Sequence, residues 1–110
     1  MIELIIYNYL KNVLSVEVFM ERPENELKEY VLLQKTGSSK ENYICSATFA
    51  LQSYAESLLR AAEINEEVKK AMDNLIILDE ISKSALNSDY NYTDTAKKKY
   101  RYQAVYDVFF

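Results

Sequence analysis

The sequence predicts an α+β fold: a two-layer sandwich in which an antiparallel sheet of about four to five strands carries an N-terminal helix and one long central helix on one face. Two observations lead to this prediction. Apolar residues recur at helical spacing over residues 2–14 and again over residues 58–75. Residues 43–52 and 98–110 instead alternate their side chains with the period of a strand. We expect residues 1–110 to form a single domain.

The opening segment predicts one amphipathic helix, because Ile2, Ile6 and Leu10 fall on one side and polar residues on the other. A short β-branched strand is predicted at residues 16–19. The polar stretch at residues 21–26 that follows is a surface connection.

A hairpin is predicted next. Residues 29–35 begin with a run that is apolar on both sides, which is typical of a central strand. Residues 36–40 are the clearest turn signal and contain the only glycine, Gly37. The alternating run 43–52 would then pair antiparallel with the first strand.

Ser53 and Glu56 match a capping box, which predicts the start of the long helix. Two more strands are predicted at residues 81–92 and 98–110, with the polar segment 93–97 between them. The predicted order of elements is therefore α-β-β-β-α-β-β.

Composition excludes several kinds of chemistry. The chain has no His, one Cys, one Gly and a net charge of −4. Catalysis by a His-activated nucleophile, His- or Cys-based metal sites and glycine-rich phosphate loops all need residues that are missing. The one thiol, Cys45, falls mid-strand and is predicted to be a buried, inert residue. We expect a protein that is not an enzyme and that uses no cofactor, metal or small-molecule substrate.

The expected localisation follows because the first residues do not match a signal peptide. Glu3 stands where a signal peptide carries positive charge, and polar residues interrupt the apolar run. No stretch approaches the roughly 20 apolar residues of a membrane span. We therefore expect synthesis in a reducing cytoplasm and no association with a membrane.

Two polar clusters are candidate sites. The segment from Asp89 to Asp94 begins like a calcium loop, but its sixth position is Asp94 rather than Gly and its twelfth is Tyr100 rather than Glu. A polar hairpin tip is the better interpretation. The basic and aromatic cluster Lys97–Tyr102 is similar to single-strand nucleic-acid platforms. The favoured interpretation is a strand edge blunted by lysines, with tyrosines that pack on the sheet.

Tyrosine is the most unusual feature of the composition, with ten in the chain and five in the last 21 residues. Tyr is enriched at protein interfaces because it joins a large apolar ring to a polar tip. Either these tyrosines belong to an aromatic sheet face, or they pack against a neighbouring subunit; the sequence favours neither. The candidate interface residues are Thr36, Gly37, Ser38, Tyr90, Tyr92, Lys98, Tyr100, Tyr102 and Tyr106.

The order and spacing of segments over the whole chain resemble the small tail-completion or tail-terminator proteins of long-tailed phages. The resemblance rests on the segments Ile6–Lys11, Val18–Pro23, Tyr30–Gly37, Ala47–Tyr54, Ala71–Leu75, Leu86–Tyr92 and Tyr100–Tyr106. None of these is a chemical signature; they match the strands, turns and tips of a small α+β fold.

This resemblance implies a structural protein that assembles as a ring, often hexameric, on the last ring of the tail tube. The ring would stop tube growth and present the surface that meets the head connector. The implied partners are the tail-tube protein, the head connector or completion proteins, and further copies of the chain. The subunit could stay monomeric in the host cytoplasm until it docks, and would end in the virion at the head-proximal end of the tail. The alternative is a small nucleic-acid-binding or accessory module that uses Lys97–Tyr102.

Overall fold

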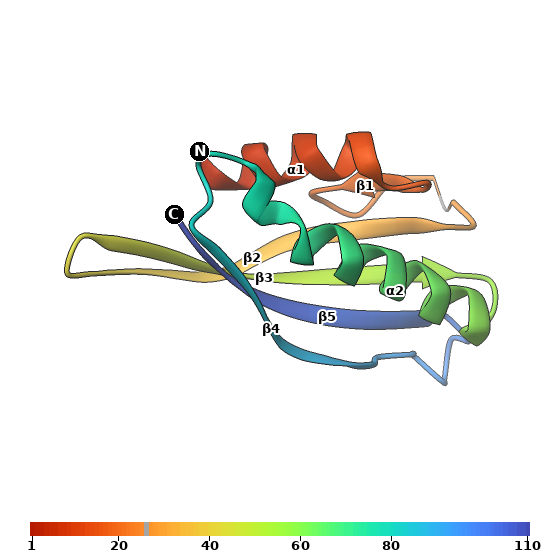
Figure 1. Cartoon of the computed structure of the whole chain (residues 1–110). Helices are drawn as coiled ribbons and strands as arrows, with labels where there is room; N and C mark the ends of the chain where they lie inside the picture. Colours follow the sequence, from red (N-terminus) through yellow and green to blue (C-terminus); the bar gives the residue numbers. More distant parts are fainter. Residues whose placement is uncertain (26) are drawn as a thin grey trace.

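The elements follow the predicted order in the computed structural model, which describes residues 1–25 and 27–110 (Figure 1). Within these residues lie two α-helices, one 3-10 turn and five strands. The helices are α1 (Ile2–Val13) and α2 (Leu58–Asp73), followed by the 3-10 turn η1 (Leu75–Ile77). The strands are β1 (Glu17–Phe19), β2 (Tyr30–Glu41), β3 (Ile44–Ala55), β4 (Lys83–Asn91) and β5 (Tyr100–Phe109). Of the connection predicted at residues 21–26, residue 26 lies outside the described residues.

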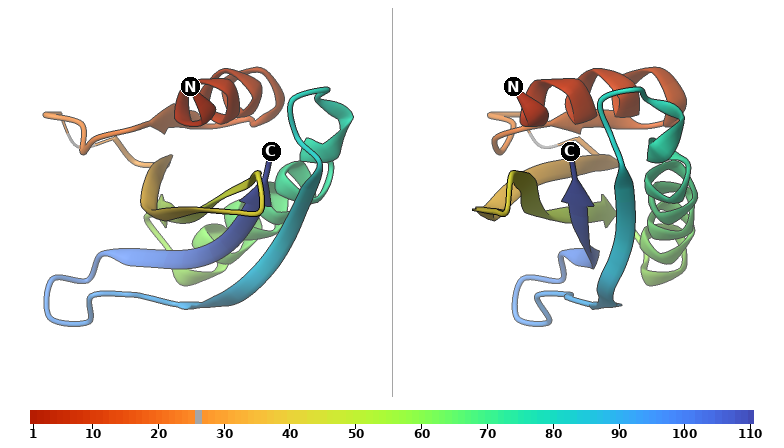
Figure 2. Two further views of the ribbon diagram at one scale, coloured as in Figure 1. Left: turned by 90° about the vertical axis from the view of Figure 1, so that its left-hand side faces the viewer. Right: turned by 60° about the vertical axis from the view of Figure 1, so that its left-hand side comes forward.

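The five strands form one sheet in the order β1-β2-β3-β5-β4. Only the short β1 pairs in parallel, with β2; every other pair is antiparallel. Both helices lie on the same face of this sheet, with α1 beside β1 and α2 across β3, β5 and β4 (Figure 2). The predicted α+β class, with helices on one face of a mostly antiparallel sheet, is confirmed.

One apolar core fills the space between the helices and the sheet. Its members come from the inward side of each element, and many are fully buried. They include Ile6 and Leu10 of α1, Val31 and Leu33 of β2, Phe49 and Leu51 of β3, Ile64, Val68 and Met72 of α2, and Tyr106 and Val108 of β5. The alternation in β3 and β5 therefore predicted correctly which residues share a face.

The predicted turn at residues 36–40 is wrong. Instead β2 continues to Glu41, and Gly37 pairs with Thr48 of β3 beside an irregularity in register. The chain reverses at Asn42 and Tyr43, whose φ angles are 49° and 66°. A two-residue hairpin turn of type I′ needs positive φ at both central positions, as at Asn42 and Tyr43, and Gly37 does not have a positive φ. The turn propensity of Gly and Ser was outweighed by continuous pairing of the two strands.

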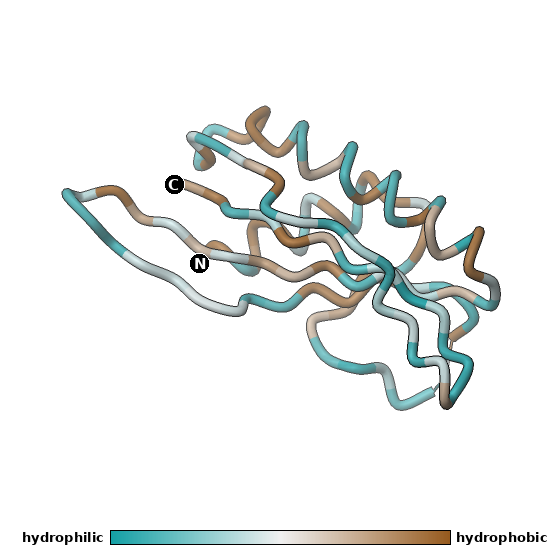
Figure 3. The backbone as a smooth tube through the Cα atoms, turned by 90° about the horizontal axis from the view of Figure 1, so that it is seen from below, coloured by the Kyte–Doolittle hydropathy of each residue, from teal (hydrophilic) through white to brown (hydrophobic). Residues whose placement is uncertain are grey.

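The hairpin consequently extends beyond the rest of the sheet. Pairing between β3 and β5 begins at Ser46, so residues 40–45 carry on as a two-stranded projection, which we call the arm. The arm projects on the left of Figure 1. Figure 3 shows it as largely hydrophilic or neutral, with a hydrophobic segment beside its tip.

The predicted capping box is also wrong. Ser53 is fully buried in β3, which continues to Ala55. The N-cap of α2 is Ser57, whose side chain accepts a hydrogen bond from the Arg60 backbone amide at 3.2 Å. The core-facing side of β3 extends through Ser53 and Ala55. Because these residues are buried in the strand, the N-cap of the helix lies four residues later than predicted. Among the described residues, no helix is both long and apolar enough to cross a membrane.

Candidate interaction surfaces

Tyr106 is a core residue and not a contact residue. It has no exposed surface. Its hydroxyl donates to the Lys69 carbonyl at 3.1 Å and to the Asp73 carboxylate at 2.9 Å, which ties β5 to the last turns of α2. Burial, with the neighbouring Asp73 carboxylate, raises the pKa of Tyr106 well above its usual range. Tyr106 cannot reach a partner of the folded chain, so its place among the candidate interface residues is wrong.

The other C-terminal tyrosines lie on two faces. Tyr100 and Tyr102 are half-buried and pack against the core on the helix side. Tyr90 and Tyr92 lie on the opposite face, 42% and 44% exposed, with their rings edge to face at 5.8 Å. Tyr90 and Tyr92 are therefore the most exposed members of this group.

The residues of the basic and aromatic cluster Lys97–Tyr102 also lie in different places. Lys97 and Lys98 lie in the exposed turn between β4 and β5, where Lys98 has a φ of 53°. The side chain of Arg101 is on the helix-free face, away from Tyr100 and Tyr102. Its guanidinium donates to the Tyr92 carbonyl at 2.6 Å and lies 4.3 Å from the centre of the Tyr92 ring. Cations and rings that are neighbours in sequence thus do not form one stacking platform.

A hydrogen-bonded band crosses the helix-free face of the sheet. Gln52 of β3 donates to Gln103 of β5 at 2.7 Å, and Gln103 donates in turn to the hydroxyl of Tyr90 on β4. Tyr54 donates to Gln52 at 3.1 Å and accepts from Arg101 at 3.0 Å. Sequence reasoning missed this band, although Gln52 and Gln103 occupy the polar positions of two alternating strands.

Aromatic rings continue the band toward β1. Tyr30 and Tyr54 stack with their centroids 4.6 Å apart, and Phe19 meets Tyr30 edge to face at 5.9 Å. Both tyrosines are only 6% exposed. Burial raises the pKa of Tyr30, so its hydroxyl stays protonated over the physiological range.

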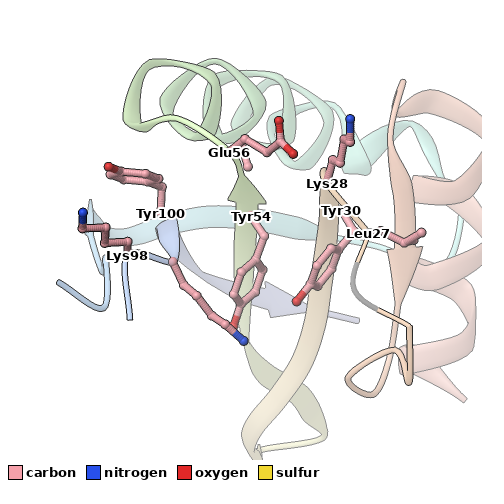
Figure 4. A pocket seen from close by; sticks show the side chains of 9 residues that line it. Leu27, Lys28, Tyr30, Tyr54, Glu56, Lys98 and Tyr100 are labelled. Atoms are coloured by element: carbon pink, nitrogen blue, oxygen red, sulfur yellow. The ribbon is translucent and has the colours of Figure 1, made fainter. Parts of the chain in front are cut away.

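A groove opens where β3 ends, at the opposite end of the sheet from the arm. We call it the end groove; its volume is about 310 Å³. Its apolar lining comes from Leu27, Tyr30, Tyr54 and Tyr100. Figure 4 shows Tyr54 and Tyr30 side by side between Tyr100 and Leu27, with Glu56 and Lys28 at one margin and Lys98 beside Tyr100. The groove thus combines aromatic walls with charged margins of both signs.

The arm holds the second exposed feature. Thr36, Gly37 and Ser38 form the exposed stretch of β2 at its base, where the Thr36 hydroxyl donates to the Thr48 carbonyl at 3.3 Å. At the tip, Tyr43 is 94% exposed and Ile44 is 57% exposed. Sequence reasoning missed Tyr43. The available signal was Asn42, since Asn tolerates the left-handed conformation of a tight hairpin turn.

The two acidic residues of the segment from Asp89 to Asp94 have different structural roles. Asp89 faces α2, where it accepts from Asn65 at 2.8 Å and from Lys69 at 2.7 Å. The hydrogen bond from Lys69 lowers the pKa of Asp89. Asp94 instead accepts from the amides of Ala96 and Lys97 and so organises the turn. The described residues contain no group of three or more Asp, Glu or Cys side chains placed to hold a metal ion.

Cys45 is half-buried in the arm and is not fully buried as predicted. Its carbonyl accepts from the Phe110 amide at 2.9 Å, which anchors the chain end beside the arm. Within the described residues, no helix covers the projecting arm (Figure 1), and this leaves the thiol partly accessible.

Comparison with protein-family models and with curated proteins gave no match to this chain.

Proposed function

We propose that this chain is a structural assembly protein of a long-tailed phage, a tail-terminator or tail-completion subunit. It would cap the tail tube at the head-proximal end and form the surface that joins the tail to the head. Its partners in this proposal are the tail-tube protein, the head connector or completion proteins, and further copies of itself in a ring, often hexameric. It would act first in the host cytoplasm and then in the virion.

The observation that carries this proposal is the arm. A closed ring needs head-to-tail contacts, in which each subunit offers two different surfaces. This chain has a projecting hairpin with an exposed Tyr43 at one end. At the other end it has a groove with aromatic walls and charged margins. Such a shape suits a subunit that works by contact with its neighbours.

The fold and the sequence pattern support the proposal together. The resemblance extends over the whole chain and implies a small α+β domain, and the chain has that fold. The exposed members of the candidate surface are Thr36, Gly37 and Ser38 at the base of the arm, Tyr90 and Tyr92 on the helix-free face, and Lys98 in the β4–β5 turn.

The nucleic-acid alternative has less support, because the cluster that suggested it is divided between two faces. Tyr100 and Tyr102 pack against the core while Arg101 is engaged with Tyr54 and Tyr92 on the opposite side. A gel-shift assay at about 50 mM salt tests this alternative, since phosphate binding is strongest at low salt. A shift that weakens as salt rises would favour the nucleic-acid module over the ring subunit.

The test of the proposed function is deletion of the gene from its phage. We expect unjoined heads together with tails of abnormal length, seen by electron microscopy, and rescue by the wild-type gene supplied in trans. Rescue with Tyr90→Glu should be impaired although the purified variant folds, because this ring is exposed on the sheet face. Glu63→Gln, on the outer face of α2, is the matched surface control and should rescue fully. Normal virions after deletion would overturn the proposal.

A further inference from the structure

We propose that the arm of one copy docks in the end groove of a second copy, with the Tyr43 ring packed against the Tyr100 and Leu27 side chains of that groove. This inference rests on the ring-forming role proposed above and assigns the two surfaces that would make the ring contact.

The first argument is the conformation of Tyr43. Its φ of 66° lies in the left-handed region, where Gly is the favoured residue at the second position of a two-residue hairpin turn. The Cβ of Tyr43 strains the backbone at this position, and the side chain is 94% exposed. No hydrogen bond, ring contact or ion pair joins Tyr43 to another described residue. Because this strained residue makes no contact among the described residues that stabilises its own chain, we infer that its side chain is kept for recognition.

The second argument is the lack of support for the arm. Among the described residues, no third strand lies beside the arm, and only the Phe110 amide reaches it, at the Cys45 carbonyl. A two-stranded hairpin without a packed face is marginally stable in water. Docking would bury the exposed side chains of Tyr43 and Ile44 at its tip and stabilise the arm at the same time.

The third argument is chemical fit. The tip carries an aromatic ring and an aliphatic side chain, Tyr43 and Ile44, next to the charges of Lys40 and Glu41. The end groove offers the half-buried ring of Tyr100 and the exposed Leu27 side chain, with the ammonium groups of Lys28 and Lys98 and the carboxylate of Glu56 at its margins. Each charge of the tip therefore has an opposite charge available at the groove.

The fourth argument is position. The tip precedes the first residue of β3, Ile44, and the groove lies at the last, Ala55. A strand of this length spans about 36 Å, so a chain cannot place its own tip in its own groove. The contact is necessarily between two copies and joins different surfaces, which is the heterologous type that forms a ring where the rotation between copies closes.

The test is disulfide trapping between two single-cysteine proteins, both with Cys45→Ser. One carries Ile44→Cys at the tip and the other carries Lys28→Cys at the groove margin. Under mild oxidation at high protein concentration, we expect a mixed dimer of these two. The matched control is Lys70→Cys on the outer face of α2, which should give at least about tenfold less mixed dimer with the tip variant. Equal trapping with Lys28→Cys and Lys70→Cys, or a dominant tip-to-tip dimer of Ile44→Cys, would overturn the proposal.

Two further variants separate docking from folding. In the tip protein, Tyr43→Gly should lower the trapped dimer at least about tenfold while thermal unfolding shows an intact domain. Tyr43→Phe keeps the ring and should retain trapping. Undiminished trapping with Tyr43→Gly would show that the ring is not the docking element.

Trapping uses purified protein alone, so its outcome is independent of the phage experiment. A trapped tip-to-groove dimer with normal virions after gene deletion would leave the docking contact standing and refute the assembly role. Failed tail joining after deletion, without the trapped dimer, would support the assembly role and refute this contact.

Discussion

Tyr106 and Tyr43 show how differently one residue type is used in the two regions of this molecule. Tyr106 lies under α2 with no exposed surface, and its hydroxyl bonds to two acceptors on that helix. Tyr43 stands at the tip of the arm, 94% exposed and in a left-handed conformation. The region around Tyr106 is built for stability, whereas the arm carries strain and apolar surface that its own chain does not use. Tyrosine content alone therefore did not distinguish core from contact surface.

The largest loss of stability is expected from substitution of Tyr106. Tyr106→Ala should lower the free energy of unfolding by about 3–5 kcal/mol, because it removes a buried ring and leaves a cavity. Tyr106→Phe keeps the ring and should cost only about 1 kcal/mol, from the lost hydroxyl bonds. Chemical denaturation monitored by circular dichroism measures both. Tyr43→Ala is the matched control and should change stability by less than about 0.5 kcal/mol. Similar losses at the two positions would contradict the division into core and arm.

Asp89 should give the next largest effect. Asp89→Ala should cost about 1–3 kcal/mol, since the buried amide of Asn65 loses its acceptor and Lys69 loses its partner. Because the pKa of Asp89 is lowered in the folded state, its stabilising contribution is complete above the unfolded value of about 3.9 and is lost as pH falls through the lower folded value. The difference between wild type and Asp89→Asn should therefore shrink between about pH 5 and pH 2. Urea midpoints across this range test the sign, and a difference that grows in acid would contradict it.

The start of α2 offers a smaller, paired test. Ser57→Ala should cost about 1 kcal/mol, because it removes the side chain that caps the helix. Ser53→Ala should cost nothing, since the buried Ser53 hydroxyl has no hydrogen-bond partner among the described residues. Denaturation midpoints compare the two variants directly. A larger loss at Ser53 than at Ser57 would restore the capping position expected from the sequence.

The smallest change in stability is expected at the arm, where it is a gain and not a loss. Tyr43→Gly should raise the free energy of unfolding by about 0.5 kcal/mol. Relief of the left-handed strain, worth about 1–2 kcal/mol, exceeds the added flexibility that Gly gives the unfolded chain. Tyr43→Ala retains a Cβ at the same φ and should show no such gain. A loss of stability in Tyr43→Gly would mean that the ring supports its own chain.

Much of the fold was predictable because its signals are local. The helical spacing of Ile2, Ile6 and Leu10 and the alternation in β3 and β5 depend only on the period of each element. These patterns gave the order of elements, the fold class and the sets of residues that share a face. The grouping of Tyr100, Tyr102 and Tyr106 on one face was among them, and it is confirmed.

The errors arose where a local signal competed with pairing over distance. Gly37 carried the strongest turn signal, yet the strands stay paired to Glu41 and reverse at Asn42 and Tyr43. Ser53 matched a capping box, yet it lies buried in β3. In both places, continued pairing of two strands outweighed the turn or capping propensity of a few residues. The relative strength of these two effects cannot be read from a single sequence.

By itself, the sequence determined the alternation of β5, and hence that Tyr106 shares a face with Tyr100 and Tyr102 and that Arg101 and Gln103 share the other. The tertiary structure alone decided which of these faces the helices cover. Both faces carry apolar and polar atoms, so their burial depends on where α2 packs. Residues distant along the chain control that packing. The exposure of Tyr43 is decided in the same way, because it follows from where β5 stops supporting β3.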